Sequence, residues 1–338
     1  MKILLLGKNG QVGWELQRAL APLGTLIALD RTALDRTALD RTTLDWTGSL
    51  QRLCGDLTNL TGLIATIEQL KPNVVVNAAA YTAVDKAESE PLLATQINRE
   101  AVAALAKTCA QINAILVHYS TDYVFNGAGH TAWTEDDASH PLNVYGQTKR
   151  AGELAILQSG CDALIFRTSW VYATRGSNFI KTMLRLAQER EQLNIINDQT
   201  GAPTSAALIA DVTAHALKAY AEKIYAEKSY SEKTFTGKTD TEKTASLSGI
   251  YHLTAAGEVS WYDYASFIFE QARAHGVALK LQQVNAIATS AYVTPALRPL
   301  NSRLNLSKIQ RTFHLTLPDW QQGVVHTLQE LIEENIGK

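Results

Sequence analysis

The sequence predicts an α/β protein built on a doubly wound parallel sheet. Two observations carry this prediction. Short apolar runs typical of buried strands alternate with amphipathic helical patterns along the first half of the chain. A glycine-rich turn also follows the first apolar run directly, at the point where such a sheet leads into its first helix.

The expected elements follow one another in a regular order. The first apolar run, Lys2–Leu6, ends abruptly at the turn and predicts a buried strand. An amphipathic helix is expected at about Val12–Leu20, and Leu26–Leu29 predicts the second strand. Three further short apolar runs, each flanked by helical pattern, predict strands at Val74–Val76, Ile115–His118 and Leu164–Phe166.

Beyond about residue 170 this alternation loosens, which indicates a second and smaller part. A chain of 338 residues is long enough for about two domains. We therefore expect a Rossmann-type domain over residues 1–170, to which residues 205–250 return. A smaller C-terminal α/β domain, which would bind substrate, is expected over residues 171–204 and 251–338.

Two stretches of pentapeptide repeats interrupt this organisation. DRTAL, DRTAL and DRTTL follow one another from Asp30, and AEK, SEK and TEK units recur from Ala221 to Lys243. A period of five matches neither the helix nor the strand period, and solenoid repeats are longer. We expect surface insertions over residues 31–48 and 219–247 that take no part in the chemistry. A partner-binding role for the Lys/Glu repeat is the alternative.

Composition and charge exclude several classes of function. Lys and Arg number 31 against 33 Asp and Glu, so no basic excess exists to bind nucleic acid. The three cysteines, Cys54, Cys109 and Cys161, lack the spacing of a disulfide scaffold or a zinc site. The apolar runs are too short for a signal peptide or for a membrane helix of about 20 residues. We expect a soluble cytoplasmic protein without nucleic-acid or membrane partners.

Three glycines point to a dinucleotide. Gly7, Gly10 and Gly13 stand three residues apart between the first strand and the first helix. Side chains at the first two would keep a diphosphate away from the backbone, and the helix N-terminus offers free N–H groups. The strand–turn–helix context gives this motif its weight. A purely structural glycine turn is the alternative.

Residues after the next strands complete the expected cofactor site. Asp30 ends the second strand, near the offset of about 20 residues typical of a ribose-binding acid. Its carboxylate favours NADH and the adjacent Arg31 favours NADPH, so both cofactors stay open. Gly55-Asp56-Leu57 is placed to hold the adenine, with a helix N-cap at Asp56 as the alternative. Small residues, Ala78 to Ala80, would let the cofactor lie across the strand ends.

A candidate catalytic group follows the fourth strand. Thr121 and Asp122 come at its carboxyl end, the edge at which open α/β sheets bind ligands. Tyr145 and Lys149 are four residues apart, which places phenol and ammonium on one helix face. A tyrosine has a pKa of about 10, and a nearby ammonium is expected to lower it toward the range of an acid–base catalyst. YxxxK is weak alone but strong beside the glycine turn and Thr121.

These motifs together resemble the extended short-chain dehydrogenase/reductases. Within that group the chain resembles the dTDP-4-dehydrorhamnose reductase family, on the segments KILLLGKNGQVGWELQ, VNAAAYTAVDKAE, HYSTDYVFNG, NVYGQTKRAGE, FRTSWVY, NDQTGAPT and RPLNSRL. The resemblance covers nearly all the chain outside the two repeats. It implies an oxidoreductase that uses NADPH or NADH to reduce the C4 ketone of dTDP-4-dehydro-β-L-rhamnose, giving dTDP-β-L-rhamnose.

The resemblance also implies roles for individual residues. Tyr145 would donate a proton to the forming alkoxide, and Lys149 would bind the nicotinamide ribose and lower the pKa of that tyrosine. Thr121 would hydrogen-bond the carbonyl region. Asp122 would contact the sugar and Trp170 would form one wall of its pocket, with a local turn and an ordinary core aromatic as the respective alternatives. The residues that fall on the family's other cofactor positions are Gln11, Val12, Asp56, Leu57, Ala80, Tyr81, Thr82 and Tyr119.

Two further expectations concern the rest of the pocket and the assembly. Residues 197–204 and 298–303 are expected to complete the nucleotide-sugar pocket. Some family members dimerise through magnesium held by acidic residues; Glu15 occupies one such position, but Ala207 stands where a second acid is expected. A missing carboxylate removes a ligand that a hard cation needs, so we expect no metal site and a solvated Glu15. The protein would be a monomer or a homodimer.

Two other functions compete with the reductase. A catalytically idle regulatory subunit is the first, because the beta subunit of methionine adenosyltransferase resembles the same family. The intact Thr121, Tyr145 and Lys149 argue against it. An epimerase or dehydratase is the second, and a dehydratase would be expected to carry an acidic pair beside the threonine, which Thr121-Asp122-Tyr123 lacks.

Overall fold

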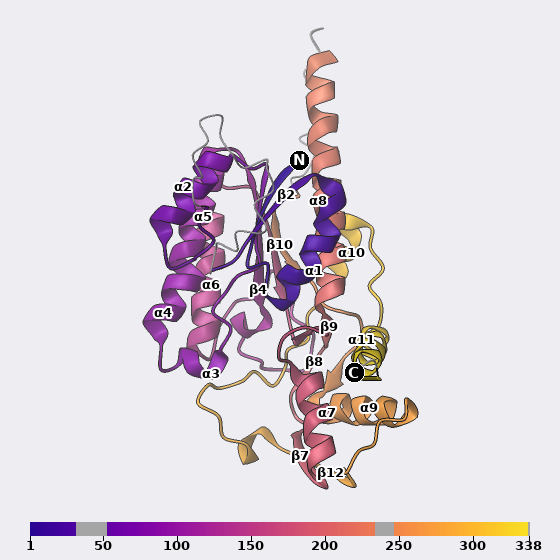
Figure 1. Ribbon diagram of the computed structural model, residues 1–338. Coiled ribbons are helices and arrows are strands. Elements are labelled where there is room, and N and C mark those ends of the chain that lie inside the picture. The colour runs from indigo at the N-terminus through magenta and orange to yellow at the C-terminus, as the bar shows by residue number, and fades with distance from the viewer. Residues whose placement is uncertain (32–52, 234–246, 337–338) are drawn as a thin grey trace.

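The computed structural model describes residues 1–31, 53–233 and 247–336. Its centre is a six-stranded sheet in which every pairing is parallel (Figure 1). In spatial order the strands are β10 (Gly249–His252), β5 (Ala163–Thr168), β4 (Ile115–Thr121), β3 (Val74–Asn77), β1 (Lys2–Leu6) and β2 (Thr25–Leu29). The predicted α/β class and its first five strands are confirmed. β10 was not predicted.

Helices cover both faces of the sheet, and β1 shows why. Ile3 and Leu5 pack into one apolar cluster, while Leu4 and Leu6 pack into the cluster on the other face. A strand that alternates between two buried faces must be apolar throughout, as its sequence is. The first face carries α1 (Gln11–Leu20), α8 (Ala206–Lys233) and α10 (Ser307–Phe313), and the other α2 (Leu60–Leu70), α5 (Ala101–Gln111) and α6 (Val144–Gln158) (Figure 1).

A second group of elements lies beyond the carboxyl edge of the sheet (Figure 1). It has an apolar cluster of its own, rich in aromatic side chains such as Tyr172, Tyr264 and Trp320. Its main elements are α7 (Phe179–Glu189), α9 (Trp261–Ala274), α11 (Trp320–Ile336) and the parallel pair β7 (Gln192–Ile196) with β12 (Gln283–Ile287). Two short strand pairs complete the strands of the described residues: β6 (Val171–Tyr172) with β9 (Thr204–Ser205), and β8 (Thr200–Gly201) with β11 (Val259–Ser260).

The remaining elements are short. They are α3 (Val84–Ala87), α4 (Pro91–Thr95), and the helical turns η1 (Ala21–Leu23), η3 (Gln96–Glu100), η4 (Asp122–Val124) and η5 (Thr289–Ala291). No helix within the described ranges is both long and apolar enough to cross a membrane.

The repeat stretches differ in what the structure describes. Nearly all of the first repeat lies outside the described residues. Part of the second does not: α8 continues through it as far as Lys233. Residues 219–233 are thus helical, although a period of five does not match the helix period. Ala, Glu and Lys are strong helix formers, and Lys218 pairs with Glu222 one turn on, at 3.8 Å between Nζ and Oε1.

Leu297 and Arg298, which come late in the chain, are hydrogen-bonded to the start of α6 and to α3. Asn143 caps α6 by accepting the Gly146 N–H at 2.8 Å, and its amide also donates to the Leu297 carbonyl at 2.7 Å. The Arg298 guanidinium makes two bonds to the Asp85 carboxylate, at 3.0 and 2.7 Å. This pairing holds the pKa of Asp85 below its ordinary value. The helix that carries Tyr145 thus has its first turn held by residues near the C-terminus.

Gly13 allows α1 to pack closely on the turn before it. A Cβ at Gly13 would lie 2.0 Å from the Gly7 carbonyl oxygen, a backbone atom that has no room to move. We expect Gly13→Ala to lower the free energy of unfolding by about 1–3 kcal/mol, because the clash exceeds the gain in helix propensity. Gly10→Ala is the matched control, since its Cβ would meet the same oxygen at 3.4 Å. Thermal unfolding of the two variants tests this, and equal melting temperatures would contradict it.

Candidate functional site

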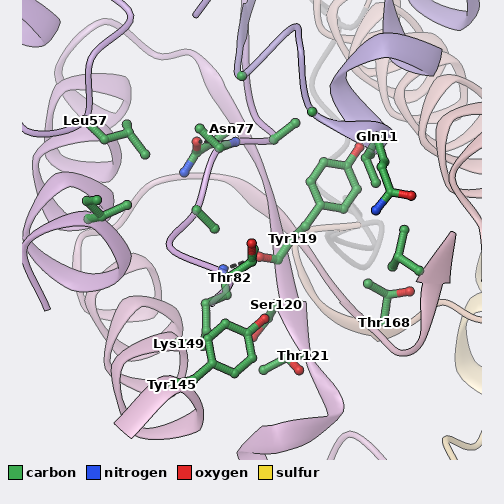
Figure 2. A pocket seen from close by; sticks show the side chains of 18 of the residues that line it. Gln11, Leu57, Asn77, Thr82, Tyr119, Ser120, Thr121, Tyr145, Lys149 and Thr168 are labelled. Carbon is green, nitrogen blue, oxygen red and sulfur yellow. Dashed lines mark hydrogen bonds between the residues drawn. The ribbon is translucent and has the colours of Figure 1, made fainter. Parts of the chain in front are cut away.

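A cavity of about 710 Å³ opens at the carboxyl ends of β1, β3, β4 and β5 (Figure 2). The chain places β2 on one side of β1 and then crosses to β3 on the other, so the cavity lies at the topological switch point of the sheet. Predicted site residues in its wall are Gly7, Gly10, Gln11, Val12, Asp30, Arg31, Asp56, Leu57, Ala80, Thr82, Tyr119, Thr121, Asp122, Tyr145, Lys149 and Trp170. Gly13 and Tyr81 are not in the wall: Gly13 packs against Gly7, and the Tyr81 hydroxyl donates to Glu90 at 2.7 Å.

The glycine turn forms a cradle in which a side chain would not fit. Gly7 has a φ of +84°, and a Cβ there would lie 2.8 Å from the Ala79 amide nitrogen. α1 begins just after Gly10, whose N-cap position supplies no side-chain hydrogen bond to the first turn. Its first N–H groups and its dipole are therefore directed at the cavity without a capping side chain. This arrangement fits a diphosphate.

Where the cavity is lined by residues after β2, it contains two opposite charges side by side. Asp30 and Arg31 both line it, and the Asn9 amide donates to the Asp30 carboxylate. Asp56 also lines this end, and its carboxylate accepts the N–H and the hydroxyl of Thr58, both at 2.9 Å. The alternative of a helix N-cap at Asp56 is wrong, because Asn59 caps α2 by accepting from Gly62.

Lys149 is buried and reaches from α6 towards β4. Its ammonium donates to the Tyr119 carbonyl at 2.5 Å (Figure 2). It also lies 3.3 Å from Nε2 of His118. The other ring nitrogen of His118, Nδ1, is 3.2 Å from the Asn77 amide. Burial lowers the pKa of Lys149 to about 8, while Glu153 opposes this shift. Burial and Lys149 together keep the pKa of His118 well below its ordinary value, so this histidine is neutral.

Tyr145 departs from the expectation about its acidity. Burial raises the pKa of its phenol to about 12, and a hydrogen bond with Thr121 only partly opposes this. The expected lowering by Lys149 is not found, because that ammonium is directed at Tyr119 and His118. The phenol therefore keeps its proton at neutral pH, which is the state that can donate one.

Thr121 and Asp122 lie beside this phenol at the end of β4. The Thr121 hydroxyl donates to the Asp122 carboxylate at 3.1 Å and accepts the Tyr123 N–H at 3.1 Å, which starts η4. Burial raises the pKa of Asp122 to about 6, while hydrogen bonds from Ser302 and Thr121 oppose the rise. Figure 2 shows Tyr145, Thr121 and Lys149 gathered at one end of the cavity and Gln11 at the other.

An aromatic wall closes the catalytic end. Trp170 lines the cavity in a left-handed backbone conformation, with a φ of +49°, which is rare for a bulky residue. Its ring stacks on Trp261 at 3.6 Å between centroids, with 14° between the planes. Gly201 makes room for it, since a Cβ there would lie 2.8 Å from Trp170 Cε2. Trp170 is thus both packed in an aromatic cluster and part of the wall.

The sequence did not predict several residues of this wall. They come from the ends of β4 and β5, from the turns that follow these strands, from loops and from α9, and include Thr58, Ser120, Tyr123, Thr168, Ser169, Ser177 and Trp261. Conversely, residues 197–204 and 298–303 do not line the cavity, contrary to expectation. The Arg298 guanidinium is held by Asp85, and Thr200 and Ser302 exchange backbone hydrogen bonds with the opposite segment. These two segments support the wall from behind.

Acidic and metal-ligating side chains do not gather anywhere in the described part of the chain. There, no group of three or more His, Cys, Asp or Glu side chains is arranged to hold a metal ion. Glu15 lies 3.7 Å from the Arg18 guanidinium, one turn along α1.

Comparison with known proteins decides between the competing functions. The family model for the RmlD substrate binding domain matches residues 1–333. The dTDP-4-dehydrorhamnose reductase of Shigella flexneri is 52% identical over 331 residues, covering 98% of both chains. The enzyme of the same name from Burkholderia thailandensis is 43% identical over 336 residues, covering 99% of this chain and 100% of that one.

The chain belongs to the dTDP-4-dehydrorhamnose reductase family. The resemblance drawn from the sequence segments is confirmed, and so is the assignment to NAD(P)H-dependent oxidoreductases. Nothing in these matches supports the regulatory-subunit alternative.

Solved structures of the family agree with this fold. A Bacillus anthracis dTDP-4-dehydrorhamnose reductase in complex with NADP has a TM-score of 0.76 and 29% identity, covering 98% of this chain and 100% of that chain. A Clostridium acetobutylicum member has a TM-score of 0.77 and 31% identity, covering 98% of this chain and 99% of that chain. The Rossmann-type sheet of this chain is therefore that of the family.

Proposed function

We propose that the protein reduces the C4 ketone of dTDP-4-dehydro-β-L-rhamnose with NADPH or NADH to give dTDP-β-L-rhamnose. One observation carries the proposal: a protonated tyrosine, a buried lysine and a dinucleotide cradle line the same cavity. The names of the relatives supply the substrate. Thr121, Tyr145 and Lys149 are the residues to which we assign the chemistry.

The cradle residues bind the dinucleotide. Gly7, Gly10, Gln11 and Val12 receive the diphosphate at the N-terminus of α1, and Gly13 keeps this helix close to the turn. Asp30 and Arg31 flank the adenosine ribose, where the first favours NADH and the second NADPH. The other residues assigned to the cofactor are Asp56, Leu57, Ala80, Thr82, Tyr119, Tyr145 and Lys149. Tyr81 was expected among them but does not line the cavity. The bound cofactor supplies the hydride for C4.

Tyr145 donates the proton that the C4 oxygen needs. Its raised pKa means that the phenol is protonated before reaction, as a reduction requires. The Thr121 hydroxyl orients the substrate carbonyl, and Lys149 binds the nicotinamide ribose.

The sugar is bound by Asp122 and Trp170. Asp122 is buried beside Thr121 and offers carboxylate oxygens to the sugar hydroxyls. Trp170 presents an aromatic face to the apolar side of the pyranose, the usual way in which sugars are held.

The same proposal includes the organisation and setting of the protein. Residues 1–170 with 205–250 form the cofactor domain, and residues 171–204 with 251–338 mainly the substrate domain. Of the insertions expected at residues 31–48 and 219–247, residues 32–48 and 234–246 lie outside the described residues. The protein works in the cytoplasm, as a monomer or a homodimer.

Absorbance at 340 nm tests the reaction directly. The labile substrate is generated in the cuvette by the preceding epimerase, and NADPH and then NADH are supplied. We expect enzyme-dependent loss of absorbance with dTDP-rhamnose as product. Cofactor binding without any loss of absorbance would contradict the proposal and favour a regulatory role.

A further inference from the structure

His118 is a buried titratable group to which the proposed reaction assigns no role. It stands on β4 directly before Tyr119, is 1% exposed and does not belong to the cavity wall. Its register partner on β3 is Asn77, so the two side chains lie next to each other on one face of the sheet. Lys149 reaches this face from α6, and the three side chains form a buried row.

Asn77 determines the direction of the hydrogen bonds in this row. Its Oδ1 accepts the Ala79 N–H at 3.2 Å, and its Nδ2 therefore faces Nδ1 of His118, also at 3.2 Å. An amide nitrogen can only donate, so Nδ1 accepts and carries no proton. The neutral imidazole then carries its proton on Nε2, the nitrogen that lies 3.3 Å from the Lys149 Nζ.

This tautomer opposes the charged form of Lys149. Nε2–H is a donor, and an ammonium also has donors only. The two groups form a hydrogen bond when Lys149 is a neutral amine, because its lone pair then accepts from Nε2–H. A charged Lys149 either leaves Nε2–H without an acceptor or forces the other tautomer of His118, whose Nδ1–H would face the Asn77 amide. In both cases a buried hydrogen bond is lost.

The charged groups near this row leave the balance to His118. The titratable side chains on the elements around Lys149 are His118, Asp122, Tyr145, Arg150, Glu153 and Arg167. Glu153 favours the ammonium from one helical turn away. However, the Arg167 guanidinium binds its carboxylate at 2.9 and 2.8 Å and offsets much of its charge. Among the described residues, His118 is the titratable group in direct contact with the Lys149 Nζ.

We propose that His118 is a positioning residue that, with its tautomer fixed by Asn77, holds Lys149 in balance between its charged and neutral forms. The inference rests on the proposed function, in which the ammonium binds the nicotinamide ribose. Burial lowers the pKa of Lys149 to about 8, and the facing Nε2–H acts in the same direction. His118 thus helps to set the pH above which the enzyme loses this cofactor contact.

His118→Gln tests this role, because a glutamine can place a carbonyl oxygen near the position of Nε2 and accept from the ammonium. Nitrogen NMR of lysine-labelled protein without cofactor follows the titration of Lys149, whose signal is identified by its loss in Lys149→Arg. We expect the midpoint to rise by roughly one pH unit in His118→Gln, the size typical of one charge-assisted hydrogen bond. The alkaline break in kcat/KM should move by the same amount.

His252→Gln is the matched control. His252 is also fully buried in the sheet, on β10, and its ring packs edge-on against Phe125 at 5.7 Å between centroids. The loss of a buried imidazole is therefore similar in the two variants, but the midpoint of Lys149 should stay unchanged in His252→Gln. An equal rise in both variants, or an unchanged midpoint in His118→Gln, would overturn the proposal.

The tautomer is measured on the wild-type protein, so the inference stays testable even if a variant does not fold. Nitrogen NMR of histidine-labelled protein, at a pH above the midpoint of Lys149, should show the His118 proton on Nε2. A proton on Nδ1 would overturn the proposal. Asn77→Asp should move the proton to Nδ1, because a carboxylate only accepts. Protein with the expected tautomer and midpoints that does not oxidise NADPH would contradict the proposed reaction but not the role of His118.

Discussion

Tyr145→Phe should lower kcat roughly 100- to 10,000-fold, the range typical of losing a general acid. The substitution removes only the hydroxyl, so the aromatic ring still fills its buried place in the wall. NADPH binding, followed by the fluorescence of the nicotinamide, should be nearly unchanged. Turnover is measured by absorbance at 340 nm. A kcat within a few-fold of wild type would show that another group supplies the proton.

Tyr123→Phe is the matched comparison for this experiment. The Tyr123 ring packs edge-on against Tyr145, at 5.7 Å between centroids, and it also lines the cavity. Burial raises the pKa of this phenol too. However, Tyr123 has no lysine one helical turn away and follows Thr121 on η4. Its loss should reduce kcat much less, and equal losses in the two variants would contradict the choice of Tyr145.

Lys149→Ala should damage both cofactor binding and turnover, because the ammonium that binds the nicotinamide ribose also positions the hydride donor for the reaction. We expect NADPH to bind about tenfold more weakly, since a charge-assisted hydrogen bond contributes about 1.5–3 kcal/mol. kcat should fall as well, which distinguishes this variant from one that only weakens binding. The melting temperature serves as the check on folding. If KM rose while kcat stayed at the wild-type value, Lys149 would have no part in the chemical step.

The pH dependence follows from the same lysine. Its pKa is lowered to about 8, so the ammonium is present below that pH and is lost as the pH rises through it. Tyr145 keeps its proton far above this range. The value of kcat/KM should therefore fall above about pH 8. A guanidinium at this position would stay charged, so Lys149→Arg should lack this break in whatever activity it retains. A break that persists in Lys149→Arg would belong to another group.

The sequence predicts the cofactor half of this site better than the substrate half. Gly7, Gly10, Tyr145 and Lys149 lie in short motifs whose spacing already determines their geometry within one turn or one helix. The same holds for Thr121, because its strand end is marked by a clear apolar run. All five line the cavity.

The parts that could not be predicted depend on packing between distant segments. Trp261 reaches the wall because its ring packs on Trp170 from an element far along the chain, and nothing near it in the sequence marks a site. Arg298 stands in a polar segment that was expected to line the pocket, but its guanidinium is hydrogen-bonded to the Asp85 carboxylate instead. The pKa of Tyr145 is set by burial, which spacing along a helix does not reveal. Local motifs report local geometry, and these features are not local.

The bonds from Asn143 to Leu297 and from Arg298 to Asp85 have a consequence for the nascent chain. The first bond joins two residues that are 154 positions apart in the sequence, and the second joins two that are 213 positions apart. Neither bond can form until Leu297 and Arg298 have been synthesised. The turn that cradles the diphosphate needs only residues from the first third of the chain. During translation, dinucleotide affinity should thus arise earlier than a fixed orientation of Tyr145, and catalytic competence should be among the last properties that the polypeptide acquires.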